Sequence, residues 1–240
     1  MVCAQGHSFD IARSGYVNLL QPQDRRSRDP GDSGVAVMAR RRLHDQGITQ
    51  PLAQAIQDLT AVSQTDSVLD VGCGEGFYAG HISEASGAAC SGLDISVAAI
   101  EAAARRYNGC EWVVANADRF IPWSDASFSV VLSITGRMNP GEFRRVLRPG
   151  GRLLVAIASP EDLIELRGEG RDRRERTVTE FGGHFKLVAQ SRATTTAELD
   201  AASVEDVLLA VYRPMRQAPV EAMRLTFSLD LLLFEAGAIG

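Results

Sequence analysis

The sequence predicts an α/β fold built on a mostly parallel sheet with helices on both faces. From residue 67 to about residue 158, short apolar segments of strand type alternate with helical segments. That alternation is typical of a parallel sheet covered on both sides. The first of these strands runs into a glycine-rich turn. Further along, after the charged residues 169–176, two strand-like segments are separated by one helix, which suggests a late pair resembling a hairpin.

Residues 1 to about 60 precede the alternation, and we expect them to form an N-terminal extension. They include a short apolar segment at residues 15–20 and helical patterning at residues 35–45 and 51–62. The second helical segment opens with proline, which suits the first turn of a helix. We therefore divide the chain into an extension of residues 1–60 and a main domain of residues 61–240.

Each element of the main domain corresponds to a short segment. Seven strands are expected, at residues 67–71, 89–93, 112–115, 130–134, 152–158, 185–193 and 225–234. Helices are expected near residues 78–86, 96–107, 140–147 and 204–210. Arginine, proline and two glycines at residues 148–151 are typical of a tight turn from a helix into a strand.

The segment from Asp70 to Gly76 has the most specific pattern in the chain. A tight strand-to-helix turn needs residues without a Cβ, and the helix end that follows presents free N–H groups to a ligand. A dinucleotide site has Gly-x-Gly-x-x-Gly, whereas here the third glycine comes one residue early and an acid precedes the first. Asp94 ends the next strand, where an acid accepts hydrogen bonds from ribose hydroxyls or, alternatively, caps a helix. The turn could also be an ordinary junction, but the two acids and the glycines together favour a cofactor site.

Length and composition limit the class of protein. With 240 residues and 45% hydrophobic content, the chain can form one well-packed domain with an appendage. No apolar run reaches the roughly 20 residues that span a bilayer, and no leader-like segment opens the sequence, so we expect a soluble, cytoplasmic protein without a membrane partner. The four cysteines show no disulfide framework. The net charge of −5 argues against general nucleic-acid binding but permits a local basic face.

The pattern Asp70-x-Gly72-x-Gly74-x-Gly76 resembles the first motif of class I methyltransferases. That resemblance implies a Rossmann-like sheet of seven strands in which the last is antiparallel. It also implies S-adenosylmethionine as cofactor and S-adenosylhomocysteine as product.

A wider resemblance covers nearly the whole chain. Six segments follow one another as they do in the bacterial large-subunit (23S) rRNA guanine-N1 methyltransferases, a family that includes macrolide self-resistance enzymes. These segments are residues 7–10, 15–20, 28–33, 39–41, 70–76 and 163–168. The Gly-Tyr-Val-Asn-Leu-Leu segment at residues 15–20 is not a general methyltransferase feature, so the resemblance is to this family in particular.

The resemblance implies positions for the cofactor. Gly74 and Glu75 should lie against it, Asp94 should hold its ribose, and Asn116 and Ala117 should lie near its adenine. The complete set of expected cofactor residues is Asp70, Gly72, Cys73, Gly74, Glu75, Gly76, Asp94, Ile95, Asn116, Ala117, Ser133 and Thr49.

The chain departs from the family pattern in its metal module. Family members open with a four-ligand zinc module, of which this sequence keeps only Cys3 and His7. A closed structural zinc site needs four protein ligands. We therefore expect no metal, unless Cys3 and His7 belong to a surviving partial site.

Further departures lie on the acceptor side, because ligands of open α/β sheets bind beyond the carboxyl ends of the strands. The family usually has an aromatic residue at the position of Thr49, Ala-Pro within residues 135–137, histidine at Asp162 and a different turn at Tyr212. The expected acceptor residues are Tyr16, Thr135, Gly136, Arg137, Asp162 and Tyr212.

These departures favour a diverged N-methyltransferase for a small heteroaromatic or nucleobase-like acceptor. The alternative is a true 23S rRNA guanine-N1 methyltransferase, for housekeeping or antibiotic resistance, with phosphate contacts from the arginines within residues 25–28 and 40–42. A third class, a regulator that binds the cofactor without catalysis, fits less well with an intact cofactor turn. The sequence leaves the oligomeric state open.

The chemistry of methyl transfer suggests two catalytic candidates. A nitrogen acceptor such as guanine N1 carries a proton that a base must remove. Asp162 is either that base or a residue at a helix N-terminus. Arg137 either orients the acceptor through paired hydrogen bonds or lies free on the surface. His44, His81 and His184 have no partners at useful spacing and receive no role.

Overall fold

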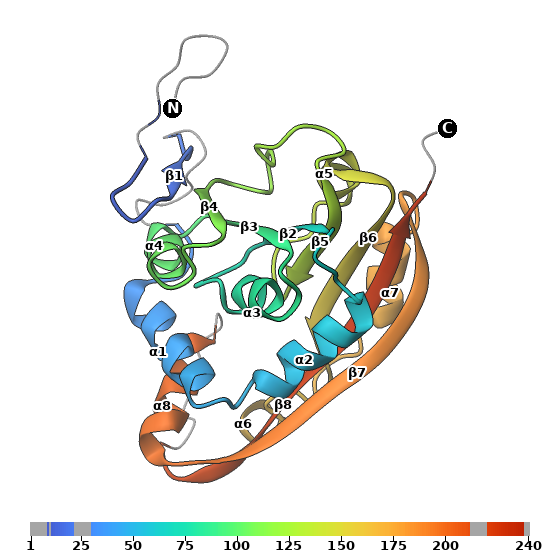
Figure 1. The fold of residues 1–240 in the computed structure, drawn as a ribbon. Coiled ribbons are helices and arrows are strands. Elements are labelled where there is room, and N and C mark those ends of the chain that lie inside the picture. The colour runs from blue at the N-terminus through green and yellow to red at the C-terminus, as the bar shows by residue number, and fades with distance from the viewer. Residues whose placement is uncertain (1–8, 10, 22–29, 212–219, 238–240) are drawn as a thin grey trace.

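The computed structural model describes residues 9, 11–21, 30–211 and 220–237. Its strands form one sheet in the order β1-β4-β3-β2-β5-β6-β8-β7 (Figure 1). The central strands are parallel, and β8 runs antiparallel to both β6 and β7. The predicted α/β class and the antiparallel last strand are confirmed.

The described residues form eight strands, where seven were predicted. They are β1 (Val17–Asn18), β2 (Ser67–Val71), β3 (Ala89–Asp94), β4 (Glu111–Val114), β5 (Phe128–Ile134), β6 (Leu147–Ala158), β7 (Phe185–Leu199) and β8 (Met223–Ala236). The additional strand is β1, which joins the edge of the sheet by pairing in parallel with β4. The N-terminal segment is thus part of the sheet.

The last two strands are longer than predicted. They pair along their whole length, from Phe185 opposite Ala236 to Leu199 opposite Met223. The predicted segment at residues 185–193 stopped short because the threonines that follow, Thr194–Thr196, are polar. Threonine is β-branched and suits a half-exposed strand, so the hairpin continues past them.

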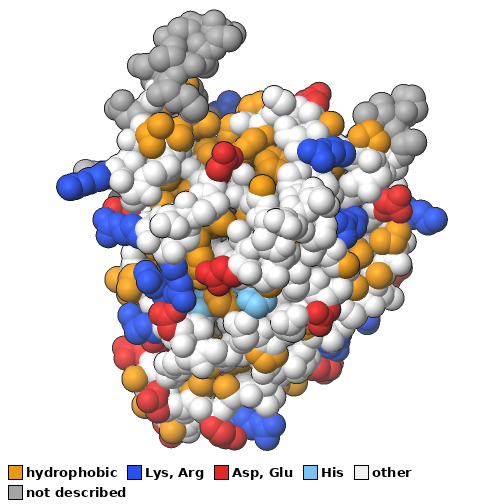
Figure 2. All heavy atoms as spheres, in the orientation of Figure 1, with side chains coloured by type: hydrophobic (Ala, Val, Ile, Leu, Met, Phe, Trp, Pro, Cys, Tyr) orange, Lys and Arg blue, Asp and Glu red, His pale blue; other side chains and the backbone are white. Residues whose placement is uncertain are grey.

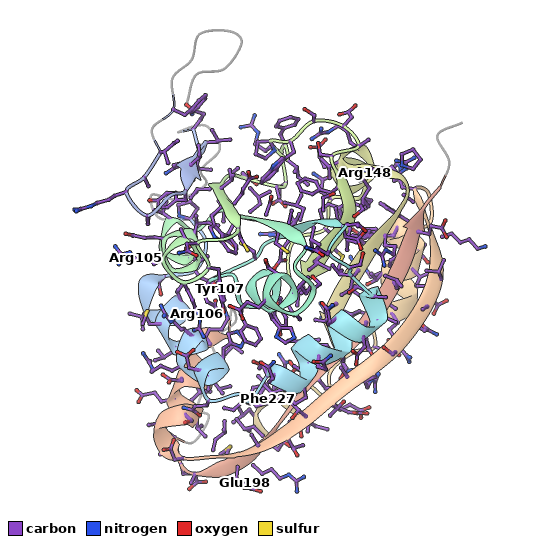
Figure 3. The ribbon with its side chains drawn as sticks, in the orientation of Figure 1. Arg105, Arg106, Tyr107, Arg148, Glu198 and Phe227 are labelled. Atoms are coloured by element: carbon purple, nitrogen blue, oxygen red, sulfur yellow. The ribbon has the colours of Figure 1, made fainter. Side chains whose placement is uncertain are left out.

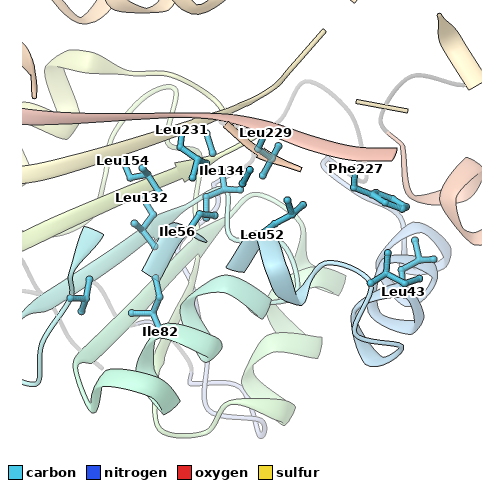
Figure 4. Packing of buried hydrophobic residues seen from close by; sticks show 14 of the residues in the cluster. Leu43, Leu52, Ile56, Ile82, Leu132, Ile134, Leu154, Phe227, Leu229 and Leu231 are labelled. Atoms are coloured by element: carbon cyan, nitrogen blue, oxygen red, sulfur yellow. The ribbon is translucent and has the colours of Figure 1, made fainter. Parts of the chain in front are cut away.

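Helices cover both faces of the sheet. They are α1 (Gly34–Asp45), α2 (Gln50–Thr60), α3 (Phe77–Ser86), α4 (Val97–Arg106), α5 (Pro140–Val146), α6 (Ile164–Arg167), α7 (Arg174–Phe181) and α8 (Ala201–Ala210). A core on one face joins α2 and α3 to the sheet through residues such as Ile56, Ile82 and Leu132 (Figure 4). A second core, with Phe143 of α5 and Phe181 of α7, lies on the other face. Packing in these two cores holds the helices in place against the two faces of the sheet.

Helix α1 of the N-terminal region packs against α8 near the C-terminus. Arg42 pairs with Asp206 through two hydrogen bonds, Nε to Oδ2 at 2.8 Å and Nη2 to Oδ1 at 2.5 Å. Gln46 Nε2 donates to Ser203 Oγ at 3.1 Å. These contacts bring α1 against elements that come much later in the chain, although the boundary near residue 60 stays a prediction.

Candidate cofactor and acceptor site

The turn between β2 and α3 has the conformation that its glycines predict. Gly72, Gly74 and Gly76 have φ values of 78°, 55° and 80°, in the left-handed region that side chains disfavour. A Cβ on Gly76 would lie 2.5 Å from the ring of Trp112. A Cβ on Gly72 would contact Gly136 of the neighbouring loop at 3.4 Å. The glycines therefore allow the backbone of two loops to approach closely at the carboxyl end of the sheet.

Asp70 ends β2 as a buried carboxyl group. Only 1% of the residue is exposed, and neither carboxyl oxygen has a hydrogen-bond partner among the described residues. Burial, together with the charges of Asp94 and Glu75, raises the pKa of Asp70 to about 8. An unpaired buried acid of this kind is costly unless a ligand satisfies it.

Asp94 links the cofactor turn to the next helix. Its Oδ2 accepts a hydrogen bond from Gly74 N at 3.0 Å, and its Oδ1 accepts one from Ser96 N at 2.8 Å. Burial raises the pKa of Asp94 despite these two donors. The N-cap of α4 is Ser96, whose Oγ accepts a hydrogen bond from Ala99 N. Asp94 therefore does not cap this helix. Each oxygen of Asp94 keeps a lone pair for a further donor.

Asn116 and Ala117, two other expected cofactor residues, lie after β4 in a loop that is held by its own backbone hydrogen bonds. The backbone oxygen of Asn116 accepts hydrogen bonds from Arg119 N and Phe120 N. Asn139 Nδ2 donates to the backbone oxygen of Ala117 at 2.9 Å. The loop is thereby held against the start of α5, at the same end of the sheet as the glycine turn.

Helix α1 contributes side chains to the cofactor turn that the sequence analysis did not predict. Arg40 donates to Asp32 Oδ2 at 2.7 Å and lies 3.7 Å from Glu75 Oε2. His44 Nε2 lies 3.0 Å from Glu75 Oε1, and His44 Nδ1 contacts Thr49 Oγ1. The prediction that His44 has no useful partner is wrong, because Glu75 is 31 residues away in sequence and only the fold brings them together.

Arg40 also has contacts within the protein that compete with the phosphate contact expected for it. Besides Asp32 and Glu75, its guanidinium reaches the backbone oxygen of Ala210 at 2.9 Å. Arg41 and Arg42 lie on α1 beside Asp45 and Asp206. Arg40 therefore points into the protein and stabilises the cofactor turn.

The loop after β5 has a strained conformation. Thr135 has a φ of 52°, which is unfavourable for a β-branched residue, and its N–H donates to Ala156 O at 2.8 Å. Ser133 Oγ donates to the backbone oxygen of Arg137 at 3.2 Å and so closes the turn around Gly136. Arg137 itself is exposed, with Nε 3.9 Å from Asp118 Oδ2. Strain held in this way is common at ligand sites.

Asp162 lies beyond the end of β6, where α6 begins. Ser228 N donates to its Oδ1 at 3.0 Å, and Arg167 pairs with its other oxygen. Burial raises the pKa of Asp162 in spite of both donors. The carboxylate is thus engaged in holding the loop to β8, and a role as base would have to use its remaining lone pairs.

The remaining predicted residues are separate from this group or lie outside the described part of the chain. Tyr16 lines a hollow of about 320 Å³ together with Glu101 and Arg105 of α4, at the edge of the sheet. Tyr212, Cys3 and His7 lie outside the described residues, so the predictions for them stay open. Cys73 is buried in the cofactor turn, and Ile95 packs beside α4.

Comparisons with known proteins agree with this geometry. The family described as methyltransferase domain matches residues 68–151, and the family described as RlmA, N-terminal, matches residues 1–28. A 23S rRNA (guanine(748)-N(1))-methyltransferase of Streptomyces fradiae is 34% identical over 233 residues, which cover 92% of this chain and 82% of that protein. The chain belongs to the 23S rRNA guanine-N1 methyltransferase family.

Other members of this methyltransferase family match over a shorter span. YxjB of Bacillus subtilis (strain 168), whose name as a 23S rRNA (guanine-N(1)-)-methyltransferase is provisional, is 34% identical over 70% of this chain and 61% of its own length. A Micromonospora griseorubida protein with the same provisional name is 34% identical over 68% of this chain and 60% of its own length.

Solved structures show the same fold at low identity. A chain from the complex between the Haloferax volcanii Trm112 methyltransferase activator and its provisionally named methyltransferase covers 85% of this chain and 96% of its own, with a TM-score of 0.60 and 18% identity. The [4+2]-cyclase SpnF covers 79% of this chain and 81% of its own, with a TM-score of 0.55 and 16% identity. Because these include a cyclase, the fold by itself does not fix the reaction.

This family member is an S-adenosylmethionine-dependent methyltransferase, as the glycine motif predicted. The residues present fit that cofactor. The glycines of the turn carry no side chain that would block a ligand. The buried carboxyl oxygens of Asp70 and Glu75 have no hydrogen-bond partner among the described residues, so they can accept from a cationic or hydroxyl-bearing ligand. Among the residues that the structure describes, none of the helices has the length and apolar character that a membrane crossing requires.

Proposed function

We propose that this methyltransferase transfers a methyl group to N1 of a guanine in 23S rRNA. The observation that carries the proposal is the 34% identity to the Streptomyces fradiae enzyme over 92% of this chain. The similarity extends well beyond the cofactor turn, into the regions that must meet the acceptor. It favours the rRNA alternative over a diverged enzyme for a small acceptor, which the comparisons do not support.

Guanine N1 lies on the Watson–Crick edge of the base and carries a proton at neutral pH. The base must therefore be unpaired or turned out of its helix before it reaches the site, as enzymes that modify bases commonly require. When bound, S-adenosylmethionine supplies the methyl group from its sulfonium centre. The protein has to hold N1 in line at about 3–3.5 Å from that carbon, and such positioning supplies roughly 7–11 kcal/mol of the barrier.

Residues at the carboxyl ends of β5 and β6 are the candidates for holding the base. Thr135 and Gly136 form the strained turn beside Gly72, and Arg137 stands exposed at its end. A guanidinium in that position can donate hydrogen bonds to the carbonyl oxygen of the base or to an adjacent phosphate. Asp162, already paired with Arg167, remains a candidate for the base that takes the N1 proton.

An arginine-bearing edge of the molecule is the candidate surface for the rRNA backbone. Arg105 and Arg106 project from α4 at this edge (Figure 3), and basic side chains gather there beside α1 and β1 (Figure 2). Arg13 and Arg105 line the hollow beside Tyr16. Arginines beside an aromatic ring can bind phosphates and stack an unpaired base, which is how proteins commonly bind single-stranded RNA.

The proposal is tested by offering both acceptors to the enzyme. Labelled S-adenosylmethionine is incubated with unmodified 23S rRNA and, separately, with a metabolite extract. Label in the RNA at a single guanine, seen also as a reverse-transcriptase stop because N1 methylation blocks pairing, is expected. Label only in the small-molecule fraction would overturn the proposal and restore the small-acceptor hypothesis.

A further inference from the structure

His44 occupies an unusual place for a histidine without an assigned role. It is 8% exposed and lies on α1, facing the start of α3. Its ring stacks on Phe77, with centroids 3.9 Å apart and planes 5° from parallel, and it meets the ring of Tyr78 edge-on. The two aromatic residues directly follow the last glycine of the cofactor turn. The imidazole is therefore packed onto the first turn of the helix that begins at the cofactor site.

Both nitrogens of this buried ring have polar neighbours. Nε2 lies 3.0 Å from Glu75 Oε1, and Nδ1 contacts the hydroxyl of Thr49 at the start of α2. With a proton on Nε2, the ring directs an N–H toward Glu75, and its Nδ1 can accept from the Thr49 hydroxyl. Glu75, His44 and Thr49 thus form a polar chain that runs from the cofactor turn to the junction of α1 and α2.

Glu75 is the member of this polar chain that lies in the glycine turn between β2 and α3. It is 4% exposed, and neither oxygen has a well-formed hydrogen bond among the described residues, so its partners are the contacts with His44 and Arg40. Burial opposes ionisation, but His44 and then Arg40 outweigh it and lower the pKa of Glu75. A buried carboxylate kept ionised in this way retains lone pairs for a ligand donor.

We infer that His44 is a positioning residue, which holds the Glu75 carboxylate in place for S-adenosylmethionine. It acts through Glu75 and through its stacking on Phe77. The inference rests on the use of S-adenosylmethionine and is independent of the rRNA acceptor. It assigns to the N-terminal helix α1 a part in cofactor binding, which the 1–60 and 61–240 division of the chain does not suggest.

The variants that test this inference separate the stacking of the His44 ring from its polar contact with Glu75. His44→Phe keeps an aromatic ring beside Phe77 and removes the donor to Glu75, whereas His44→Gln keeps a donor and removes the ring. His81 is the matched control, because its ring also faces Phe77, at 6.5 Å, while its Nδ1 is bonded to Gln50. The readout is the Kd of S-adenosylhomocysteine by calorimetry, with the thermal transition of each variant recorded alongside.

We expect His44→Phe to raise the Kd about tenfold or more, the loss typical of a hydrogen bond to a charged group. His44→Gln should recover part of that loss, and His81→Phe should leave the Kd unchanged. In a Glu75→Gln background, His44→Phe should add little, because the group it positions is already altered. An unchanged Kd in His44→Phe, an equal loss in His81→Phe, or a loss that adds fully to that of Glu75→Gln would overturn the inference.

A structural role alone would give a different pattern. If His44→Phe loses its thermal transition, the His44→Gln and Glu75→Gln variants decide the question through the same cycle. If the double variant loses less binding free energy than the two single variants added together, the result supports positioning through Glu75. Losses that add independently contradict it.

Discussion

Asp94 has two structural hydrogen bonds and, we propose, one to the cofactor ribose. Asp94→Ala should weaken S-adenosylmethionine binding by about 1.5–3 kcal/mol, as expected for lost hydrogen bonds to a charged group. Calorimetric titration measures this directly. Asp94→Asn is the control, since an amide keeps one acceptor oxygen for Gly74 N or Ser96 N. Equal affinity of the alanine variant and the natural protein would show that the ribose lies elsewhere.

Asp70 gives the folded protein a distinctive pH dependence. Its pKa is about 8 in the folded state against an ordinary 3.8, so between these values the folded protein holds a proton that the unfolded chain has released. The contribution of Asp70 to the free energy of unfolding therefore falls as pH rises from about 4 to about 8.

Denaturant unfolding at pH 5 and pH 8 tests this, with Asp70→Asn as the comparison. The variant cannot ionise at this position, so its stability should decline less between the two pH values than that of the natural protein. Identical declines would mean that Asp70 ionises normally. A cationic ligand should also favour the ionised form, and cofactor binding near pH 7 should then release a proton to the buffer.

The element that depends most on a single residue is α3, whose N-cap is Gly76. Gly76→Ala places a Cβ in the left-handed region and 2.5 Å from Trp112. The left-handed backbone conformation alone should lower the free energy of unfolding of the variant by at least about 1 kcal/mol. The clash with Trp112 should lower it further. Gly109→Ala is the control, because a Cβ there meets nothing within 4 Å. Similar stabilities of the two variants would contradict this account of the turn.

Local pattern predicted the elements of the sheet well, because each central strand is a short apolar run bounded by turn residues. It missed β1 because a two-residue strand has no periodicity, and it shortened β7 because Thr194–Thr196 do not look buried. The tight turn after β2 was predictable because its three glycines lie close together in the sequence, and all three have positive φ. The contacts of His44 with Glu75 and of Arg40 with Asp32 were not predictable from the sequence. They depend on how α1 packs in the fold and not on a recognisable spacing.

At the scale of the whole molecule, the proposed rRNA acceptor raises the question of which surface would contact the nucleic acid. The net charge is −5, so attraction to RNA has to come from a local basic region. Arg13 and Arg105 at the edge beside β1 and α4 are candidates for such contacts. Arg40 is a weaker candidate, because its side chain is 27% exposed and bonded to Asp32, whereas Arg105, paired with Glu101, is 69% exposed.

Replacing Arg13 and Arg105 by alanine should weaken rRNA binding and flatten its salt dependence. Each lost phosphate contact should reduce the slope of log K against log salt by about 0.7–0.9. The Kd of S-adenosylhomocysteine should stay the same, because neither side chain contacts the cofactor turn. Arg148→Ala, on a different part of the molecule (Figure 3), serves as the control. An unchanged slope would place the RNA on another face.

Nucleoside analysis of 23S rRNA after reaction tests the central claim most directly. Unmodified rRNA treated with the enzyme and S-adenosylmethionine is digested, and the methylated nucleoside is identified by mass spectrometry against authentic standards. The account predicts 1-methylguanosine, in an amount approaching one per rRNA molecule. Methylation of another base or another guanine atom, or no methylated nucleoside while the cofactor is consumed on a small acceptor, would contradict it.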